Sequence, residues 1–462
     1  MKTSRAFVGI VISLLPTALA WGATPAEVAQ LGGKEMTSVG AQRAGNRSGT
    51  IPAFHGAEKP LPGWQWGKYR LNYWRYKNEK PLFIINASNV DKYAENLSPG
   101  QIQMLRQLKG YTMPVYPTHR DCGFPKFVRQ NTKETALKSE IGRDGWSLKY
   151  AILPSVPFPI PTSGIEVVWN WLVRYQGLGM DWTHGGWTLL SNSPGSDDHV
   201  YGEYSQIMYY PWAAPGQHTP QENDGVLTAW LYKYMTPASL AGQALLQRYY
   251  FSQPTDSWYY FTGQRRVRRL PAYAYDAPLI GWENQYPADT SFSFIGNPDR
   301  FNWTIVGKKD LYIPYNSFQM QQFNYKIKDA LLPQFVNPAL RRYELHRVWV
   351  VKGVVKPGMR DLTPVKVLYI DEDDWLLAIE NEYDAEGKLW RSKENFSAPE
   401  WEIGSCAVNA ETYTDLIDGR YILDQTVIGT GGDLKWFPPG AKNPKLTLGY
   451  YTPENLEAIS ER

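Results

Sequence analysis

The sequence has few of the residues that most catalytic and metal sites need. Only two cysteines and six histidines occur among 462 residues. The chain contains no His-Glu-x-x-His pair, no phosphate-binding glycine loop, no dinucleotide-binding glycine fingerprint and no Gly-x-Ser-x-Gly turn. None of the histidines pairs at a spacing typical of metal ligands. We therefore expect no metal site, no cofactor and no enzymatic activity.

The chain also lacks an excess of charge of either sign. Lysine and arginine total 48, aspartate and glutamate total 45, and the formal net charge is +3. Nucleic-acid-binding proteins usually present a strongly basic face, so we expect no nucleic-acid partner. Charged residues make up 20% of the chain, which excludes a disordered polyelectrolyte, and two cysteines exclude a small disulfide framework.

A short apolar run lies near the N-terminus. Lys2 and Arg5 precede an apolar stretch from Phe7 to Leu15, and a small-residue cleavage pattern ends at Ala20. This order is typical of a secretory signal peptide over residues 1–20, cut after Ala20. The stretch is too short to span a bilayer, and no later segment is long and apolar enough for a transmembrane helix. We therefore expect an exported protein.

Export permits a disulfide between the two cysteines. Cys122 and Cys406 lie far apart in the sequence. A bond between them would close a large loop and stabilise the fold by roughly 2–4 kcal/mol, if their geometry allows it. Two unrelated buried thiols are the equal alternative.

Aromatic residues are the most abundant unusual feature. The chain has 19 Trp, 31 Tyr and 16 Phe, together 14% of its residues, along with 39 Gly and 34 Pro. Aromatic residues favour strands, while glycine and proline favour turns. This composition predicts a β-rich protein with a large aromatic surface, which is either buried or offered to a ligand.

Three segments follow the signal peptide. Residues 21–160 are rich in proline and predict an N-terminal wrapping segment with short helices. Residues 161–430 are expected to form the main domain, and residues 431–462 a loosely packed C-terminal tail. Within the main domain, Ser163 and Glu166 form a capping box for a helix over 163–177 with one apolar stripe. That helix either packs on a sheet, covers a ligand cavity, or does both.

From about residue 200 the hydrophobic pattern has a period of two, which is typical of strands. Short connections between the strands favour an antiparallel meander over residues 200–430. The fold class we expect is therefore α+β, mainly β, with one strongly curved antiparallel sheet and helices over its concave face. The predicted strands are Val226–Tyr234, Ala244–Phe251, Ser257–Leu270, Asn302–Tyr312, Tyr343–Val355, Val365–Asp371, Trp375–Tyr383, Lys388–Phe396 and Tyr421–Ile428.

Two pairs of acids raise the possibility of a glycosidase. The pairs are Asp373/Asp374 and Glu380/Glu382. Glycosidases place two carboxylates across an aromatic-lined cleft, and Glu380 and Glu382 would share one strand face. Alternating acids on a strand are more often its solvated face, and this is the interpretation that we favour.

The densest run of charge contains four arginines. Arg265, Arg266, Arg268 and Arg269 lie on a single predicted strand, where Arg265 and Arg269 would point to one face and the other two to the opposite face. Surface ion pairs are one explanation for such a run. A docking patch or an anionic head-group site is the other, because guanidinium groups bind carboxylate and phosphate with two hydrogen bonds.

Ten short motifs along the chain form a distinctive combination: Gly40–Asn46, Gly49–Ala53, Lys80–Phe83, Met113–Thr118, Pro159–Pro161, Trp169–Asn170, Gly263–Arg269, Asp299–Arg300, Tyr312–Asn316 and Tyr343–Trp349. Together these motifs resemble a family of Gram-negative bacteria, the domain-of-unknown-function 1329 family, which is grouped with the lipoprotein-sorting proteins LolA and LolB. The motifs cover nearly the whole chain after the signal peptide. The family does not typically have a cysteine near position 122, so a disulfide would be particular to this chain.

The resemblance implies an unclosed, LolA-like barrel whose cavity holds acyl chains, and it implies no catalytic residue. It also implies a periplasmic location and work beside an inner-membrane transporter and an outer-membrane protein. We therefore expect a carrier for a lipid-like or other hydrophobic molecule. Candidate ligand-binding residues are Trp169, Trp258, Tyr260, Trp303, Trp349 and Trp375. The alternatives are a carbohydrate-binding or glycoside-active protein, and a scaffold of a transporter complex without a ligand of its own.

Overall fold

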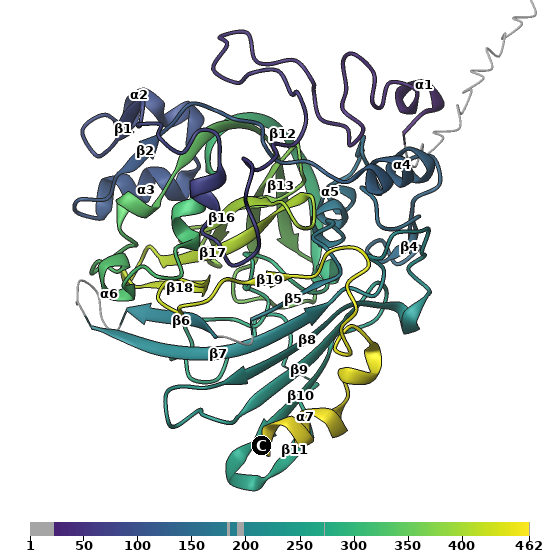
Figure 1. The fold of residues 1–462 in the computed structure, drawn as a ribbon, viewed down its shortest axis with the longest axis vertical. Coiled ribbons are helices and arrows are strands. Elements are labelled where there is room, and N and C mark those ends of the chain that lie inside the picture. Colours follow the sequence, from purple (N-terminus) through teal and green to yellow (C-terminus); the bar gives the residue numbers. More distant parts are fainter. Residues whose placement is uncertain (1–22, 183–184, 192–197, 272, 462) are drawn as a thin grey trace, which may run out of the picture.

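One large curved sheet dominates the structure, a computed structural model that describes residues 23–182, 185–191, 198–271 and 273–461 (Figure 1). The predicted signal peptide at 1–20 lies outside the described residues. Within them, 17 strands belong to this sheet, and a separate hairpin of β3 (Glu140–Ile141) and β4 (Leu148–Tyr150) lies apart from it.

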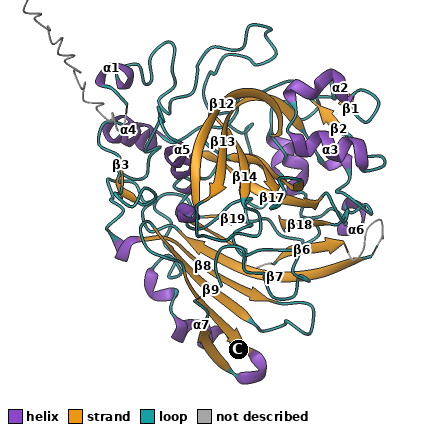
Figure 2. Ribbon diagram, turned by 180° about the vertical axis from the view of Figure 1, so that it is seen from behind, coloured by secondary structure: helices purple, strands orange, loops and turns teal. Residues whose placement is uncertain are grey.

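The first arm of the sheet is an antiparallel meander, in which each strand pairs with the next one along the chain. Its strands are β12 (Phe301–Pro314), β13 (Tyr343–Val355), β14 (Val365–Asp371), β15 (Leu377–Tyr383), β16 (Leu389–Glu400), β17 (Ser405–Asp415) and β18 (Tyr421–Thr426). Figure 2 shows β12 and β13 arching over the second arm.

The second arm is also antiparallel, and β18 pairs with β6 to join the two arms. Its strands are β6 (Gly186–Ser191), β7 (His199–Tyr209), β8 (Val226–Tyr234), β9 (Ala244–Tyr250), β10 (Asp256–Phe261) and β11 (Arg266–Arg269). Among the described residues, β12 pairs only with β13 and β11 only with β10, so the sheet is not closed.

Short strands extend the sheet at two places. β5 (Gly179–Asp181) pairs with β7 and with β19 (Lys435–Trp436). β1 (Phe83–Ile85) pairs with β2 (Met113–Val115), and β2 meets β13 through one parallel pair. The predicted fold class, mainly β with a strongly curved and unclosed antiparallel sheet, is confirmed.

The predicted strand Ser257–Leu270 is wrong as a single strand. A turn at 262–265 divides it into the hairpin of β10 and β11, and Arg265 adopts a left-handed φ of 46° in that turn. The alternation of side chains is therefore reset, and Arg265 does not share a strand face with Arg269. The sequence pattern also missed β17 altogether and placed the start of the sheet too late, because β5 and β6 precede residue 200.

Helix α5 (Gly164–Leu172) begins at the predicted capping box, where the Ser163 amide donates to the Glu166 carboxylate at 3.2 Å. The helix is buried on nearly all sides, rather than along one stripe. It packs on β12 and β13, and near its other end Trp171 and Leu172 line a pocket with residues of β7, β8 and β9. Because α5 packs on the first arm and lines a pocket with strands of the second, it lies between the two arms, on the concave side of the sheet.

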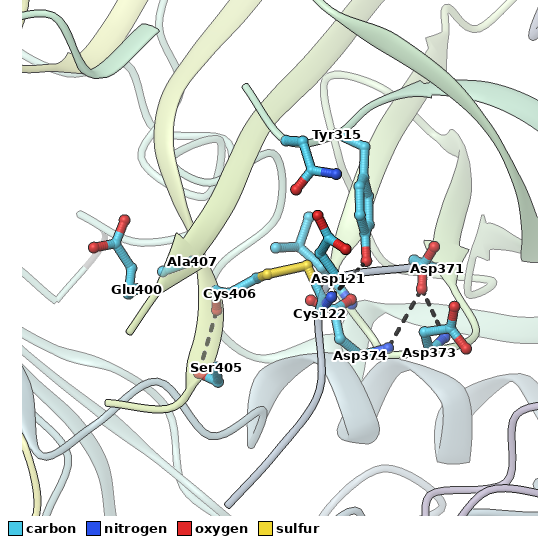
Figure 3. Close-up of a disulfide and its surroundings, with 12 residues drawn as sticks. Asp121, Cys122, Tyr315, Asp371, Asp373, Asp374, Glu400, Ser405, Cys406 and Ala407 are labelled. Atoms are coloured by element: carbon cyan, nitrogen blue, oxygen red, sulfur yellow. Dashed lines mark hydrogen bonds between the residues drawn. A yellow bond between two sulfur atoms is a disulfide. The ribbon is translucent and has the colours of Figure 1, made fainter. Parts of the chain in front are cut away.

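The N-terminal residues wrap around the sheet, and a disulfide joins them to it. Their helices are α1 (Pro25–Val28), α2 (Val90–Tyr93), α3 (Pro99–Gln107) and α4 (Lys126–Thr135). Cys122 bonds to Cys406 at the start of β17, with a Cα–Cα distance of 5.4 Å (Figure 3). The structure thus has one of the two arrangements that the sequence left open. The Cys122 amide also donates to the Tyr315 hydroxyl at 3.0 Å.

The C-terminal residues pack more closely than the sequence indicates. Besides β19 they contain α7 (Pro453–Ser460), and a short helix α6 (Ile327–Ala330) lies earlier, between β12 and β13. Tyr451 and Leu456 are fully buried. The Lys233 ammonium on β8 donates to the Ile459 carbonyl at 2.8 Å, which fastens α7 to the second arm.

Candidate ligand-binding site

A segment between β11 and β12 fills the concave face of the sheet. This covering segment, residues 273–297, contacts strands from both arms. The Phe294 ring lies 5.5 Å from the Trp303 ring on β12, while the Ser293 amide donates to the Glu411 carboxylate on β17 at 2.9 Å. Phe294 also lines a pocket with Met208 and Tyr249 of the second arm. The concave face is therefore not open to solvent along this segment.

Hydrogen bonds hold the middle of the covering segment in a strained conformation. Phe292 and Ser293 both have a positive φ, at 56° and 67°. The Lys393 ammonium donates to the Ser293 carbonyl at 2.9 Å, and the Asn395 amide donates to the Phe292 carbonyl at 3.0 Å. Non-glycine residues in this region cost of order 1–3 kcal/mol each, and such strain is commonly stored at functional sites.

Beneath the covering segment lies a network of buried ion pairs. Lys366 and Glu382 are direct neighbours across β14 and β15, and their Nζ and Oε1 atoms are 2.7 Å apart. Lys393 on β16 binds both Glu380 and Glu382, at 3.0 and 2.9 Å. All four side chains are at most 2% exposed. The expectation that Glu380 and Glu382 form the solvated face of a strand is therefore wrong.

This network shifts the acidity of its carboxyl groups in opposite directions. Burial raises the pKa of Glu380 to about 7, although Lys393 and Lys366 act against that rise. Burial alone would also raise the pKa of Glu382. The positive charges of Lys366 and Lys393 outweigh this effect and hold the pKa of Glu382 below its usual value. The central glutamate of the network is thus the one that stays ionised.

The other acid pair is also buried and paired. Asp373 accepts from the Arg120 guanidinium, which reaches it from the N-terminal segment, and Asp374 accepts from Arg174, just after α5, at 3.0 Å. Among the described residues, His346, Asp371 and Asp373 bring their side-chain ligand atoms within 4.8 Å of one another. His346 already contacts the Asp371 carboxylate at 3.1 Å. These acids therefore fasten segments together by ion pairs.

A third pair of carboxylates lies under the covering segment. Glu411 on β17 and Asp424 on β18 are direct cross-strand neighbours, and the Tyr286 hydroxyl of the covering segment lies within hydrogen-bond distance of both. All three side chains are at most 4% exposed. Burial, together with the Asp424 carboxylate, raises the pKa of Glu411 to about 8. Burial also raises the pKa of Asp424.

Two pockets lie between the covering segment and the second arm. The aromatic pocket, a cavity of about 20 Å³, is the one that reaches Asp424. The helix pocket, a cavity of about 40 Å³, adjoins α5. Both are narrow, and in this conformation the aromatic pocket admits little more than a water molecule. The aromatic pocket is lined by Thr188, Trp230, Tyr232, Tyr234, Leu245, Gln247, Leu279, Trp282, Tyr286, Ala288, Ser291, Asp424 and Gln425.

The six aromatic residues predicted to bind a ligand do not line these two pockets. Trp169, Trp375, Tyr260 and Trp303 are buried, whereas Trp258 and Trp349 are half-buried. Only one pair of the six stacks together: the Trp349 and Trp375 rings, 6.0 Å apart. A role in ligand binding for these six residues stays a prediction.

The sequence pattern did contain a signal for the residues that line the aromatic pocket. Trp230, Tyr232 and Tyr234 occupy alternate positions of a strand that the pattern predicted with the correct bounds. Alternation places them on one face, yet it does not say that this face is the concave one. Tyr286 and Trp282 come from the covering segment, where no periodic pattern exists to identify them.

The arginine run lies on the exposed hairpin of β10 and β11, near α7 (Figure 1). Arg269 pairs with Asp256 on β10, and Arg265 lies 3.8 Å from Glu461. Within the described part of the chain, Arg266 and Arg268 form no ion pair shorter than 4 Å, and both are exposed. The run therefore contains two paired and two unpaired guanidinium groups.

Among the described residues, no helix has both the length and the hydrophobicity needed to span a membrane.

A family model and a relative of this chain both match it over most of its length. The model of a family described as proteins of unknown function, DUF1329, matches residues 84–457. Uncharacterized protein PA3922 of Pseudomonas aeruginosa is 35% identical over 434 residues, which cover 91% of this chain and 92% of the relative.

Two solved structures share the general arrangement at low identity. One is a domain described as a candidate outer-membrane lipoprotein-sorting protein from Vibrio parahaemolyticus, with 13% identity, a TM-score of 0.43, and coverage of 64% of this chain and 98% of that one. The other is a DUF1329 family protein from Desulfovibrio piger, with 12% identity, a TM-score of 0.38, and coverage of 60% and 92%. These likenesses are too distant to support an argument about function. The family match and the relative confirm the resemblance in the sequence motifs, and the chain belongs to the DUF1329 family.

Proposed function

We propose that this protein is a periplasmic carrier that binds a hydrophobic molecule between the concave face of its sheet and the covering segment. The observation that carries the proposal is the pair of pockets beneath that segment, with walls rich in aromatic and aliphatic side chains. Ligand sites in proteins are concave and mostly apolar, with a few polar groups that fix orientation. The carrier performs no reaction.

Uptake requires the covering segment to move, because the pockets are narrow when it is closed. The strained residues Phe292 and Ser293 are held by hydrogen bonds to Lys393, Asn395 and Glu411. Release of these bonds relieves the strain and partly offsets the cost of opening. The buried ion pairs below the segment give it a defined closed position.

Two features support export and an envelope partner. The disulfide is typical of proteins from oxidising compartments, such as the periplasm. The exposed Arg266 and Arg268, which form no ion pair among the described residues, are suited to an anionic surface on a transporter or an outer-membrane protein. A carbohydrate-active site is less well supported, because the carboxylates of Glu380 and Glu382 both form ion pairs with lysines.

Native mass spectrometry of protein purified from the periplasm tests the proposal. The expected result is a non-covalent adduct of lipid size that disappears on denaturation. Ala288→Phe, which fills the aromatic pocket, should reduce the adduct, whereas Ala385→Phe on an exposed hairpin loop should leave it unchanged. Protein without an adduct, and without affinity for added long-chain alcohols or fatty acids, would instead support a scaffold without a ligand.

A further inference from the structure

The aromatic pocket combines five aromatic side chains with one carboxylate. Trp230, Tyr232 and Tyr234 come from β8, while Trp282 and Tyr286 come from the covering segment. Asp424 on β18 also lines the pocket. The faces of aromatic rings attract cations, and cages of such rings bind quaternary ammonium groups in other proteins. The walls therefore favour a positive charge over a neutral or negative one.

A break in β18 adds a second polar group to the pocket. Neighbouring residues on a regular strand point to opposite faces, so Asp424 and Gln425 would not share a pocket. Gln425 has a φ of 52°, and the register between β18 and β6 shifts at this point. Both side chains consequently line the same pocket. The strained backbone thus supplies a polar group that regular pairing would turn away.

The orientation of the Gln425 amide is fixed by its neighbours. The Trp230 indole can only donate, and it donates to the Gln206 carbonyl oxygen at 2.9 Å. The Gln206 amide nitrogen must then donate to the Gln425 oxygen, at 2.7 Å. The Gln425 nitrogen is left buried and without a partner among the described residues. An unpaired buried donor is destabilising, so an acceptor atom on a ligand in this pocket would form a favourable hydrogen bond with it.

The carboxylates near the pocket also lack a compensating cation. Among the described residues, neither Glu411 nor Asp424 forms an ion pair within 4 Å of a basic side chain. The Tyr286 hydroxyl has one proton and cannot donate to both carboxylates at once. Lys393, whose charge acts on Glu411, is already bound to Glu380, Glu382 and the Ser293 carbonyl. With Glu411 protonated, as its raised pKa favours below about pH 8, the negative charge at this site is that of Asp424, and the described residues supply no counter-charge within 4 Å of it.

We propose that the aromatic pocket binds an organic cation, a protonated amine or quaternary ammonium group, as the head group of the hydrophobic ligand. The cation lies among the rings and next to Asp424, and an acceptor atom near it takes the free Gln425 N–H. This inference rests on the proposed carrier function and narrows the class of its ligand.

Three probes of equal chain length test the inference: decylammonium, decan-1-ol and decanoate. Titration calorimetry at pH 7 and low salt gives their affinities for the full chain. Decylammonium should bind about tenfold or more tightly than decanol, because a desolvated cation–aromatic contact with a nearby carboxylate adds roughly that factor. Decanoate should bind least tightly, because its charge has the same sign as Asp424.

Variants assign the preference to this pocket. Asp424→Asn should weaken decylammonium about tenfold and leave decanol unchanged. Trp282→Leu on the covering segment is the second variant, which provides a result if Asp424→Asn fails to fold. Glu386→Gln, on an exposed hairpin loop, removes one negative charge elsewhere and should change neither affinity.

The outcomes separate the inference from the carrier function. Equal binding of all three probes would overturn the organic-cation ligand and leave the hydrophobic carrier intact. A preference for decylammonium that neither pocket variant changes would place the cation elsewhere and overturn the site. No binding of any probe to folded protein would overturn both.

Discussion

Gly353 on β13 lies directly opposite Trp303 on β12, and the indole ring occupies the space in which a Cβ atom would lie. A Cβ built at Gly353 would come within 2.6 Å of the ring carbon Cζ3. On its other side the Trp303 backbone contacts α5, where a Cβ at Gly164 would approach the Trp303 carbonyl carbon at 2.4 Å. Gly353 thus makes room for the Trp303 ring between β12 and β13, and Gly164 lets α5 approach the backbone of β12. These contacts position α5 on the concave face.

The first prediction follows from this contact. Gly353→Ala forces the buried Trp303 ring to move and should lower the free energy of unfolding by about 1–3 kcal/mol. Gly263→Ala is the matched control, because no atom lies within 4 Å of its added Cβ, and the change should be within about 0.5 kcal/mol. Urea unfolding followed by tryptophan fluorescence measures both. Equal stability of the two variants would contradict the steric explanation.

The second prediction concerns the disulfide. Replacing both Cys122 and Cys406 with alanine removes a link across 284 residues, which restricts the unfolded chain, and should cost about 2–4 kcal/mol of stability. The comparison is urea unfolding of the variant and of the oxidised wild type. Adding a reductant should destabilise the wild type and leave the variant unchanged. A variant as stable as the oxidised protein would show that the bond contributes nothing.

The third prediction is a pH dependence that originates at Glu411. Burial and Asp424 raise its pKa from 4.5 to about 8, so between these values the folded state binds a proton that the unfolded state does not. The stabilisation that Glu411 contributes is fully present below its pKa in the unfolded state. It is lost as pH rises to its pKa in the folded state, by up to about 1.4 kcal/mol per pH unit. Glu411→Gln cannot titrate and should make the slope between pH 5 and 8 less steep, leaving the contribution of Glu380, whose pKa burial raises to about 7.

The groups that face Glu411 define the controls for this experiment. Asp424, Tyr286 and Lys393 surround it, and Glu386→Gln on an exposed loop should keep the slope of the wild type. Unfolding free energies at several pH values provide the comparison. If the wild type and Glu411→Gln have parallel curves, the raised pKa has no consequence for folding.

The fourth prediction separates the two pairs of arginines. Arg266 and Arg268 have no ion-pair partner among the described residues, so replacing both with alanine should change stability by less than about 0.5 kcal/mol. If they contact an anionic partner, a photo-crosslinker at the neighbouring Gln264 should capture an envelope protein in intact cells. The double variant should reduce that yield. Arg265→Ala with Arg269→Ala, which removes the two paired arginines, should retain most of it.

The same crosslinking yield in both double variants would indicate that Arg266 and Arg268 do not contact a partner. The arginine run would then have only the ion pairs within the protein. Failure to capture any envelope protein would remove the support for a partner at this hairpin.

Local patterns in the sequence were sufficient for much of the fold. Alternating residues identified β8 and β14 with the correct bounds, and the capping box of Ser163 and Glu166 identified the start of α5. These features depend on side chains within a few residues of one another, and a linear pattern records such neighbours directly. The motifs were also sufficient to identify the family.

What the tertiary structure decided depends on contacts between distant residues. Glu380 and Glu382 alternate as surface acids do, yet they are buried because Lys366 and Lys393 from neighbouring strands and the covering segment enclose them. Alternation defines two faces but not which one is concave, since that depends on how the whole sheet curves. The covering segment has no regular period at all, and its position follows only from bonds to β16 and β17. The sequence therefore determined several of the strands and the start of α5, because these depend on neighbouring residues, whereas long-range packing determined the site.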